Sequence, residues 1–163
     1  MKPIVLIGRA DCWEEDFHNI KKLIQEFDTM AIGVDCSYKE QVDYLATYHP
    51  KDLLFCKKDF SCTKIISHRK IEDVNIDIVE CHVAPTGSSA LLGVLAAINK
   101  LNYTKIVLCG CPLIGQAKNG FKPYDDFQKG WIKKEAEIKP YVRSMSGWTK
   151  EFLGEPTKEW LDG

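Results

Sequence analysis

The stretch PTGSSALLGVLAAINKLNYTKIVLCGCPLIG, residues 85–115, predicts much of the architecture of this 163-residue chain. It begins with small and hydroxyl residues, continues into the nearly all-apolar run 88–101, and ends with the apolar run 106–109 before Gly110. The first run has the length of a helix, and the second has the length of a strand buried on both faces. We therefore predict a buried helix over 88–101 that leads into a buried strand over 106–109.

The amino-terminal part of the chain repeats this alternation of strand and helix. Residues 4–7 form an aliphatic run that stops at Gly8, and apolar residues then recur at helical spacing between residues 17 and 27. This spacing predicts an amphipathic helix lying on a sheet. Asp11 and Glu14 resemble a capping box at its start, and Asp16 is the alternative cap. Further short apolar runs predict strands over 30–34, 43–47, 64–67 and 76–79.

Strands that alternate with helices predict an α/β fold. We expect a single three-layer Rossmann-like domain with a mainly parallel sheet and an irregular carboxyl-terminal segment. Residues 1–111 would form the sheet core. Residues 112–163 would form a long loop over 112–131, where glycine and proline are frequent, and a helical tail. One domain is also the number that a chain of this length usually forms.

Composition argues against several classes of protein. Lys and Arg number 22 and Asp and Glu 23, so no overall positive field favours binding to nucleic acid or to an anionic membrane. The apolar run 90–101 is far shorter than the roughly 20 residues that a membrane helix needs, and no signal peptide is visible. We therefore expect a cytoplasmic protein. Its seven cysteines, an odd number without any Cys-x-x-Cys pair, favour free thiols over disulfides or a metal site.

The residues that follow the predicted strands are small or polar. In a parallel sheet these residues share one edge, where ligands bind. The set comprises Gly8, Arg9, Ala10, Asp11, Asp35, His49, Pro50, Thr86, Gly87, Ser88, Ser89, Gly110, Cys111 and Pro112. A helix that begins near Ser88 offers free N–H groups and hydroxyls, which suit a phosphate, and Gly87 would let the phosphate approach the backbone. The sequence therefore favours a nucleotide ligand, with Mg²⁺ as a companion ion near Asp125 or Asp126.

Each of these residues also has an explanation that needs no ligand. The hydroxyls within 86–88 could cap the helix, and Asp35 and His49 suit turns. Arg9 and Arg143 could clamp a phosphate through the guanidinium or form surface ion pairs. Neither the G-x-G-x-x-G nor the G-x-x-x-x-G-K-[ST] motif occurs, so the sequence predicts neither the standard dinucleotide site nor a P-loop.

The segment TGSSALLGVLAAINKLNYTKIVLCGCPL, residues 86–113, resembles part of the bacterial sialyltransferases that use CMP-sialic acid. It also resembles the related motility-accessory-factor glycosyltransferases, in which a Ser-Gly or Thr-Gly-Ser turn leads an apolar helix. ATYHP at 46–50, the segment LCGCPL and YVRSMSGWTKEFLGEPTKEWL at 141–161 are similar to small phage and prophage proteins. That second resemblance implies no particular activity.

The first resemblance implies a nucleotide-sugar site built from Gly8, Arg9, Asp35 and the residues Thr86, Gly87 and Ser88. Those sialyltransferases use a histidine on the carboxyl-terminal side of the sheet, whereas this chain has no histidine after His82. The catalytic base is therefore not carried over. His49 and Asp35 are the candidate bases because we expect both at the same sheet edge.

These features together predict a protein that binds a nucleotide or nucleotide sugar. It would transfer a glycosyl group to a small acceptor or to a nucleobase in phage DNA. Two alternatives stay open. The protein could bind a nucleotide without turning it over, or it could be an interaction module, such as a subunit of a homo-oligomer. The last alternative rests on four tryptophans, which form either a partner surface or part of a small core.

Overall fold

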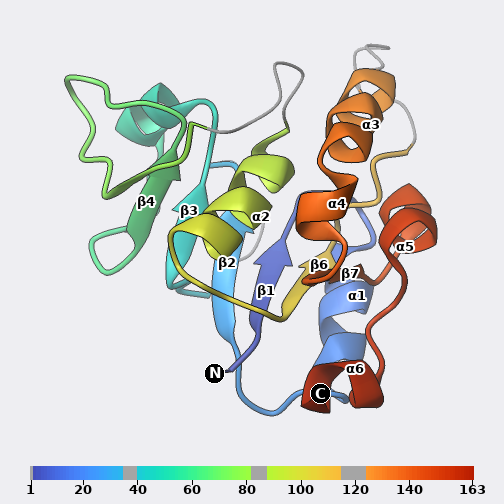
Figure 1. Cartoon of the computed structure of the whole chain (residues 1–163). Helices are drawn as coiled ribbons and strands as arrows, with labels where there is room; N and C mark the ends of the chain where they lie inside the picture. The colour runs from blue at the N-terminus through green and yellow to red at the C-terminus, as the bar shows by residue number, and fades with distance from the viewer. Residues whose placement is uncertain (1, 35–39, 82–87, 115–123) are drawn as a thin grey trace.

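The computed structural model describes residues 2–34, 40–81, 88–114 and 124–163 (Figure 1). Seven strands form one sheet in the order β5-β4-β3-β2-β1-β6-β7, and every neighbouring pair is parallel. The strands are β1 (Ile4–Ile7), β2 (Asp28–Ile32), β3 (Tyr44–Ala46), β4 (Lys64–Ser67), β5 (Ile78–Val79), β6 (Ile106–Cys109) and β7 (Val142–Ser144). The predicted Rossmann-like α/β fold with a parallel sheet is confirmed.

Strand β7 lies in the segment that the sequence predicted to be irregular. It has only three residues, and the half-buried Arg143 interrupts its apolar pattern. The other six strands overlap predicted runs, with shifts of up to two residues at their ends. Long apolar runs reveal central strands because both faces of a parallel sheet are buried, whereas a short strand at the edge of a sheet leaves no such signal.

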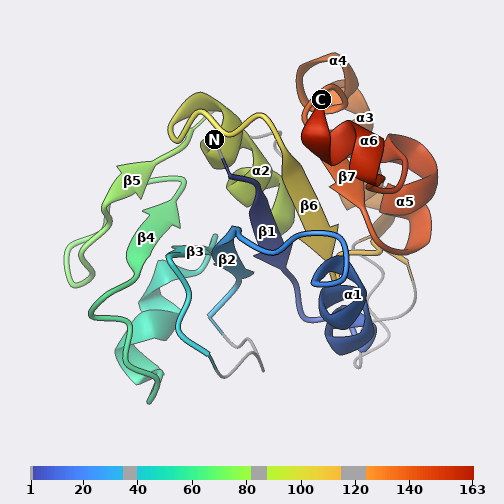
Figure 2. The same cartoon turned by 90° about the horizontal axis from the view of Figure 1, so that it is seen from below.

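Helices cover both faces of the sheet. One face packs against α2 (Ser89–Asn99), α3 (Tyr124–Lys133) and α4 (Glu135–Ile138), with α5 (Gly147–Leu153) beside them. The opposite face packs against α1 (Trp13–Ile20), which Figure 2 shows from below, and two residues of α6 (Lys158–Asp162) pack in the same core cluster as α1. A 3₁₀ helix, η1 (Pro50–Phe55), connects β3 to β4. No helix in the described ranges is long and apolar enough to cross a membrane.

Two helical predictions need correction. The first helix ends at Ile20 instead of near residue 27, because the N–H groups of Lys22 and Leu23 bond three residues back and turn the chain toward β2. Ile24 and Phe27 still pack in the same core cluster as α1, which explains their misleading spacing. In addition, α3 occupies part of the predicted loop 112–131, and residues 115–123 of that loop lie outside the described residues.

Helix α2 is apolar on all sides because it lies over the sheet and also contacts α4. Its residues from Ala90 to Ala97 are all buried. At its start, the Ser88 hydroxyl accepts a hydrogen bond from the Leu91 N–H at 3.1 Å, so Ser88 is the N-cap. The helix predicted over 88–101 is thus confirmed within two residues at each end.

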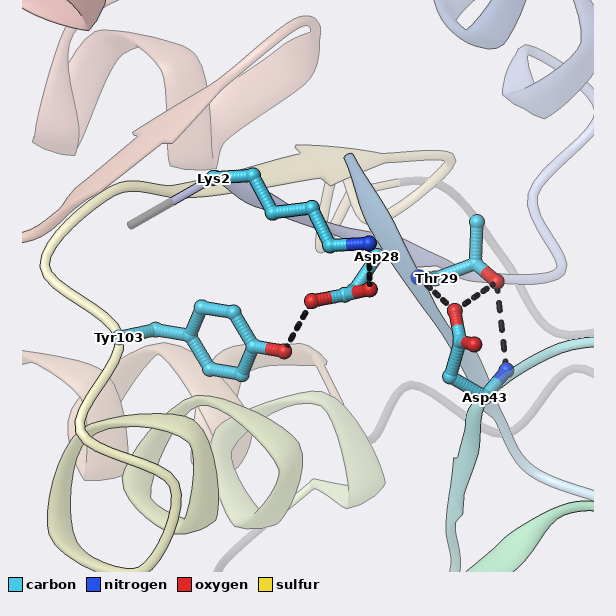
Figure 3. Close-up of polar contacts among 5 residues, drawn as sticks. All are labelled: Lys2, Asp28, Thr29, Asp43 and Tyr103. Carbon is cyan, nitrogen blue, oxygen red and sulfur yellow. Dashed lines mark hydrogen bonds and ion pairs between the residues drawn. The ribbon is translucent and has the colours of Figure 1, made fainter. Parts of the chain in front are cut away.

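Polar contacts at the amino edge of the sheet hold the strand starts together (Figure 3). The Asp28 carboxylate at the start of β2 pairs with the Lys2 ammonium at 2.6 Å and accepts a hydrogen bond from the Tyr103 hydroxyl. Beside it, the Asp43 carboxylate accepts hydrogen bonds from the Thr29 N–H at 2.8 Å and from the Thr29 hydroxyl at 3.1 Å. These contacts join the chain before β1, β3 and β6 to β2.

We expect the Tyr103 hydroxyl to make stability fall at high pH. Burial first, and then the hydrogen bond to Asp28, raise the pKa of Tyr103 above its ordinary value of 10. The unfolded chain therefore loses this proton first, so the stabilisation is complete below pH 10 and declines above it. Replacement of the hydroxyl in Tyr103→Phe should cost about 1 kcal/mol near neutral pH. Urea unfolding at increasing pH should show this difference between the two proteins shrinking above pH 10, and a constant difference would contradict the assignment.

Candidate functional site

The carboxyl edge of the sheet brings together several of the residues that the sequence selected. Arg9 follows β1, and its side chain passes Gly33 at the end of β2, where a Cβ added to Gly33 would lie 3.8 Å from the Arg9 Cδ. Gly33 donates a backbone hydrogen bond to Ala46 at the end of β3. Two residues further on, the Tyr48 N–H donates to the Ser89 hydroxyl at 3.2 Å. Arg9 and the start of α2 therefore lie along one continuous row of contacts.

The two serines at the start of α2 have different surroundings. The buried Ser88 hydroxyl accepts hydrogen bonds from the Leu91 N–H and, at 3.2 Å, from the Trp131 indole. Capping and core packing thus occupy both lone pairs of Ser88. Ser89 is half-buried and joins the edge through Tyr48. The first turn of α2 holds no acidic residue of its own that would offset the positive end of the helix dipole. Asp35, Thr86 and Gly87 lie outside the described residues.

His49 occupies the carboxyl end of β3 as an exposed residue that precedes η1. The structure adds His68, which sequence reasoning did not select for this edge. The His68 ring packs on the Tyr48 ring with centroids 4.8 Å apart, and its Nδ1 lies 3.5 Å from the Ser67 hydroxyl. Burial, followed by the positive charges of Arg69 and His49, lowers the pKa of His68. His68 is therefore mainly neutral at pH 7 and able to accept a proton.

The Tyr48 phenol at this edge stays protonated at neutral pH. Burial first, and then the negative charge of Glu80, raise the pKa of its phenol to about 12. Glu80 follows β5 and is fully buried, and the Asn99 amide donates to its carboxylate at 3.5 Å. The edge over β3 to β5 thus combines a neutral phenol, two imidazoles and a buried carboxylate. For His68 and Glu80, the only signal in the sequence was a position directly after a strand.

At the junction of β1 and β6, the loops that follow these strands close on each other. The Ala10 N–H donates to the Gly110 carbonyl at 3.2 Å, and a Cβ added to Gly8 would lie 2.3 Å from that carbonyl oxygen. Gly110 itself has a φ of +65°, and a Cβ there would meet Trp13 at 2.4 Å. Both glycines therefore have a packing reason for lacking a side chain. Contact of Gly8 with a ligand stays a prediction.

Asp16 is a further residue, besides His68 and Glu80, that the sequence did not mark as part of a site. The residue is 6% exposed, and Oδ2 accepts the Gly110 N–H at 2.8 Å and the Ser146 hydroxyl at 2.7 Å. These two bonds join α1 to the loops that follow β6 and β7. The N-cap position of α1 belongs to Cys12, which makes no side-chain cap hydrogen bond, so both predicted caps, Asp11 and Asp16, are wrong, and Asp16 lies inside the helix.

The remaining predicted residues lie apart from this row of contacts. Arg143 lies in β7, where its guanidinium donates to the backbone carbonyls of Lys139 and Val142 and packs over the Trp160 ring at 4.9 Å. Burial lowers the pKa of Arg143. Asp11 is exposed in the loop before α1. Asp125 and Asp126 are exposed in the first turn of α3, where Asp126 pairs with Lys129 at 3.3 Å. A role for Arg143 as a phosphate clamp is untested, but its present contacts are structural.

The four tryptophans contribute to the packing of the core. Trp131 is fully buried, and Trp13, Trp148 and Trp160 are half-buried against the two core clusters. Trp148 stacks on Phe152 with ring centroids 4.7 Å apart. These contacts favour the explanation in which the tryptophans close a small core over one in which they form a partner surface.

Comparison of the chain with protein-family models, with curated proteins and with solved structures finds no match.

We expect Gly8→Ala to destabilise the protein even when no ligand is present. Its new Cβ would meet the backbone carbonyl of Gly110 and the Cys111 sulfur at 2.6 Å, so the two loops must separate. Overpacking of this kind costs about 3 kcal/mol. Urea unfolding of the variant measures the effect. Unchanged stability combined with lost nucleotide binding would show instead that Gly8 is there to admit a ligand.

Proposed function

We propose that this protein binds a nucleotide or nucleotide sugar at the carboxyl edge of its sheet, between Arg9 and the start of α2. The observation that carries the proposal is the row of contacts from Arg9 through Gly33 and Tyr48 to Ser89. It places a guanidinium and the amino end of an eleven-residue apolar helix along one edge of a parallel sheet. Both groups favour a phosphate, and ligands of parallel sheets bind at this edge.

Different parts of the edge suit different parts of such a ligand. The phosphates would lie between the Arg9 guanidinium and the N–H groups of the first turn of α2. Asp35, which follows β2 in the sequence, would accept hydrogen bonds from ribose or sugar hydroxyls, as acidic residues at this position do in nucleotide-binding folds. Magnesium would accompany the phosphates as a ligand of their oxygens.

We further propose that a glycosyl group is transferred from the nucleotide sugar to a small acceptor or to a nucleobase. The resemblance of residues 86–113 to nucleotide-sugar transferases supports this activity. Transfer needs a base that removes a proton from the acceptor hydroxyl or amine. His49 and Asp35 are our candidates from sequence, and the neutral, half-buried His68 beside His49 is a third. Binding without turnover is the alternative that an assay of product would separate.

Nucleotide binding should appear as a thermal shift. At 100 times its dissociation constant, a ligand of the folded state adds about 2.7 kcal/mol, which raises the Tm by roughly 5–10 °C in a domain of this size. We expect one class of free nucleotide or nucleotide sugar to produce this shift, with and without Mg²⁺. Arg9→Gln should weaken that binding by roughly 10- to 100-fold through loss of a charge-assisted hydrogen bond.

The matched control is Lys64→Gln, because it removes the same charge from an exposed residue at the start of β4, on the opposite edge of the sheet. It should leave the shift unchanged. No shift with any nucleotide, or equal losses in the two variants, would contradict the proposed site.

Transfer is tested by product formation from nucleotide sugars with a panel of small acceptors and single-stranded DNA. If an imidazole of this edge is the base, His49→Ala or His68→Ala should lower kcat by about 100-fold or more and leave the nucleotide thermal shift in place. An intact thermal shift with no product from any donor would assign the protein to binding without turnover.

A further inference from the structure

The 3₁₀ helix η1 presents an exposed aromatic side chain at the carboxyl edge of the sheet. It begins directly after His49, and the Asp52 N–H donates to the His49 carbonyl at 3.0 Å. Figure 1 shows η1 (teal) at the carboxyl ends of β3 and β4, the edge at which α2 also begins. A molecule bound to η1 would therefore lie beside the imidazoles that we propose as candidate bases.

One side of η1 is fixed to the core and the other side faces the solvent. Pro50 is buried, and Leu53 and Cys56 pack in the same core cluster as α1. Leu54 is 49% exposed and Phe55 is 84% exposed, more than any other large hydrophobic side chain in the described ranges. A single exposed apolar residue needs no explanation, so the function of Phe55 depends on the groups that lie near it.

The groups near Phe55 include cations from two segments of the chain. Over residues 50–60 the charged residues are the cations Lys51, Lys57 and Lys58 and the anions Asp52 and Asp59. Arg69 is exposed after the end of β4, and its positive charge and that of His49 both act on His68. Lys51, Lys57 and Arg69 form no ion pair with a carboxylate in the described part of the chain. Their charges are therefore available to an anionic partner.

An exposed ring among unpaired cations fits a single strand of nucleic acid. Bases of a single strand stack on aromatic side chains, and its phosphates bind spaced cations. A membrane surface requires more apolar area, because even one myristoyl chain gives only marginal binding, and η1 offers two exposed apolar side chains. A stable protein interface takes about 800 Å² from each partner, of which these two side chains supply a fraction.

We propose that η1 and the end of β4 bind single-stranded nucleic acid, with one base stacked on Phe55 and phosphates on Lys51, Lys57 and Arg69. A neighbouring base would then be the acceptor of the glycosyl group, a role that rests on the proposed function, whereas the binding itself does not. In that transfer the bond between the anomeric carbon and the nucleotide phosphate breaks, and the carbon bonds to a nitrogen or oxygen of the base. The proton of that atom passes to an imidazole, and the nucleotide leaves with the electron pair.

Fluorescence anisotropy of the full chain with a labelled oligothymidine of about twelve nucleotides tests the surface, without any nucleotide present. We expect saturable binding that weakens roughly tenfold in Phe55→Leu, because leucine stays apolar but has no ring on which a base can stack. The exposure of Phe55 means that this variant keeps its fold. Leu54→Ala is the matched control, since it removes apolar surface beside Phe55 and no ring, and it should change the affinity by less than about twofold.

Further arms of the experiment identify the chemistry of the partner. Oligouridine of the same length separates RNA from DNA, and a duplex should bind more weakly because its bases are already stacked. Lys51→Gln and Arg69→Gln should each lower the slope of log affinity against log salt by about 0.7, the value for one phosphate contact of a single strand. Lys64→Gln, at the amino edge of the sheet, should leave that slope unchanged.

The outcomes separate this surface from the proposed nucleotide site. Absence of saturable binding, or equal losses in Phe55→Leu and Leu54→Ala, would overturn the surface, whatever the nucleotide thermal shift shows. That shift should be the same in Phe55→Leu as in the unaltered protein. Glycosylation of the bound strand would support its role as acceptor, and product from small acceptors alone would overturn that role.

Discussion

The rest of the fold depends on the return of the chain from β5, at one edge of the sheet, to β6 on the far side of β1. Helix α2 makes this return across the centre of the sheet, where the sheet lies below it and α4 beside it. A helix in this place must be apolar on all sides, so the polar groups that need partners are the backbone N–H and C=O groups at its ends. At the start, the Ser88 hydroxyl caps the helix, and it also accepts the Trp131 indole N–H, which joins α2 to α3. The position of this cap brings the amino end of α2 to the carboxyl edge of the strands.

The features that could be predicted from sequence are the elements whose burial requires a run of consecutive apolar residues. Strands β1 and β6 and helix α2 have contiguous apolar runs because they are covered on both sides. These apolar runs also locate the ends of the strands. The strand ends in turn predict that Arg9, His49 and Ser89 lie at the carboxyl edge of the sheet. Asp16 could not be found in this way, because it lies inside an amphipathic helix and bonds to residues 94 and 130 positions away along the chain. Such partners become visible only when the order of the strands is known.

The glycines show how one sequence signal serves two physical purposes. A glycine after a strand suggests an open approach to a phosphate, yet the space beside Gly8 is filled by the Gly110 carbonyl. The loops after β1 and β6 are in contact at the point where the strand order reverses, which is the usual crevice for a ligand in open parallel sheets. Asp16 reinforces this closure through the Gly110 N–H. The row of contacts that reaches α2 instead runs from Arg9 over β2 and β3, so the proposed phosphate site is displaced from the strand reversal toward those strands.

Two carboxylates at opposite edges of the sheet each join parts of the chain that lie far apart in the sequence. At the amino edge, the two oxygens of Asp28 each have a partner, the Lys2 ammonium and the Tyr103 hydroxyl (Figure 3). At the other edge, the more buried Asp16 accepts the Gly110 N–H and the Ser146 hydroxyl, and the Cys12 thiol is a further hydrogen-bond partner of its carboxylate. A carboxylate that serves only to join strands gains stability from having both oxygens occupied. Asp16 has such partners at the start of α1 and in the loops after β6 and β7, as a carboxylate removed from water requires. The two carboxylates thus fix the sheet at both edges, and the closure of the loops beside Gly8 depends on the second of them.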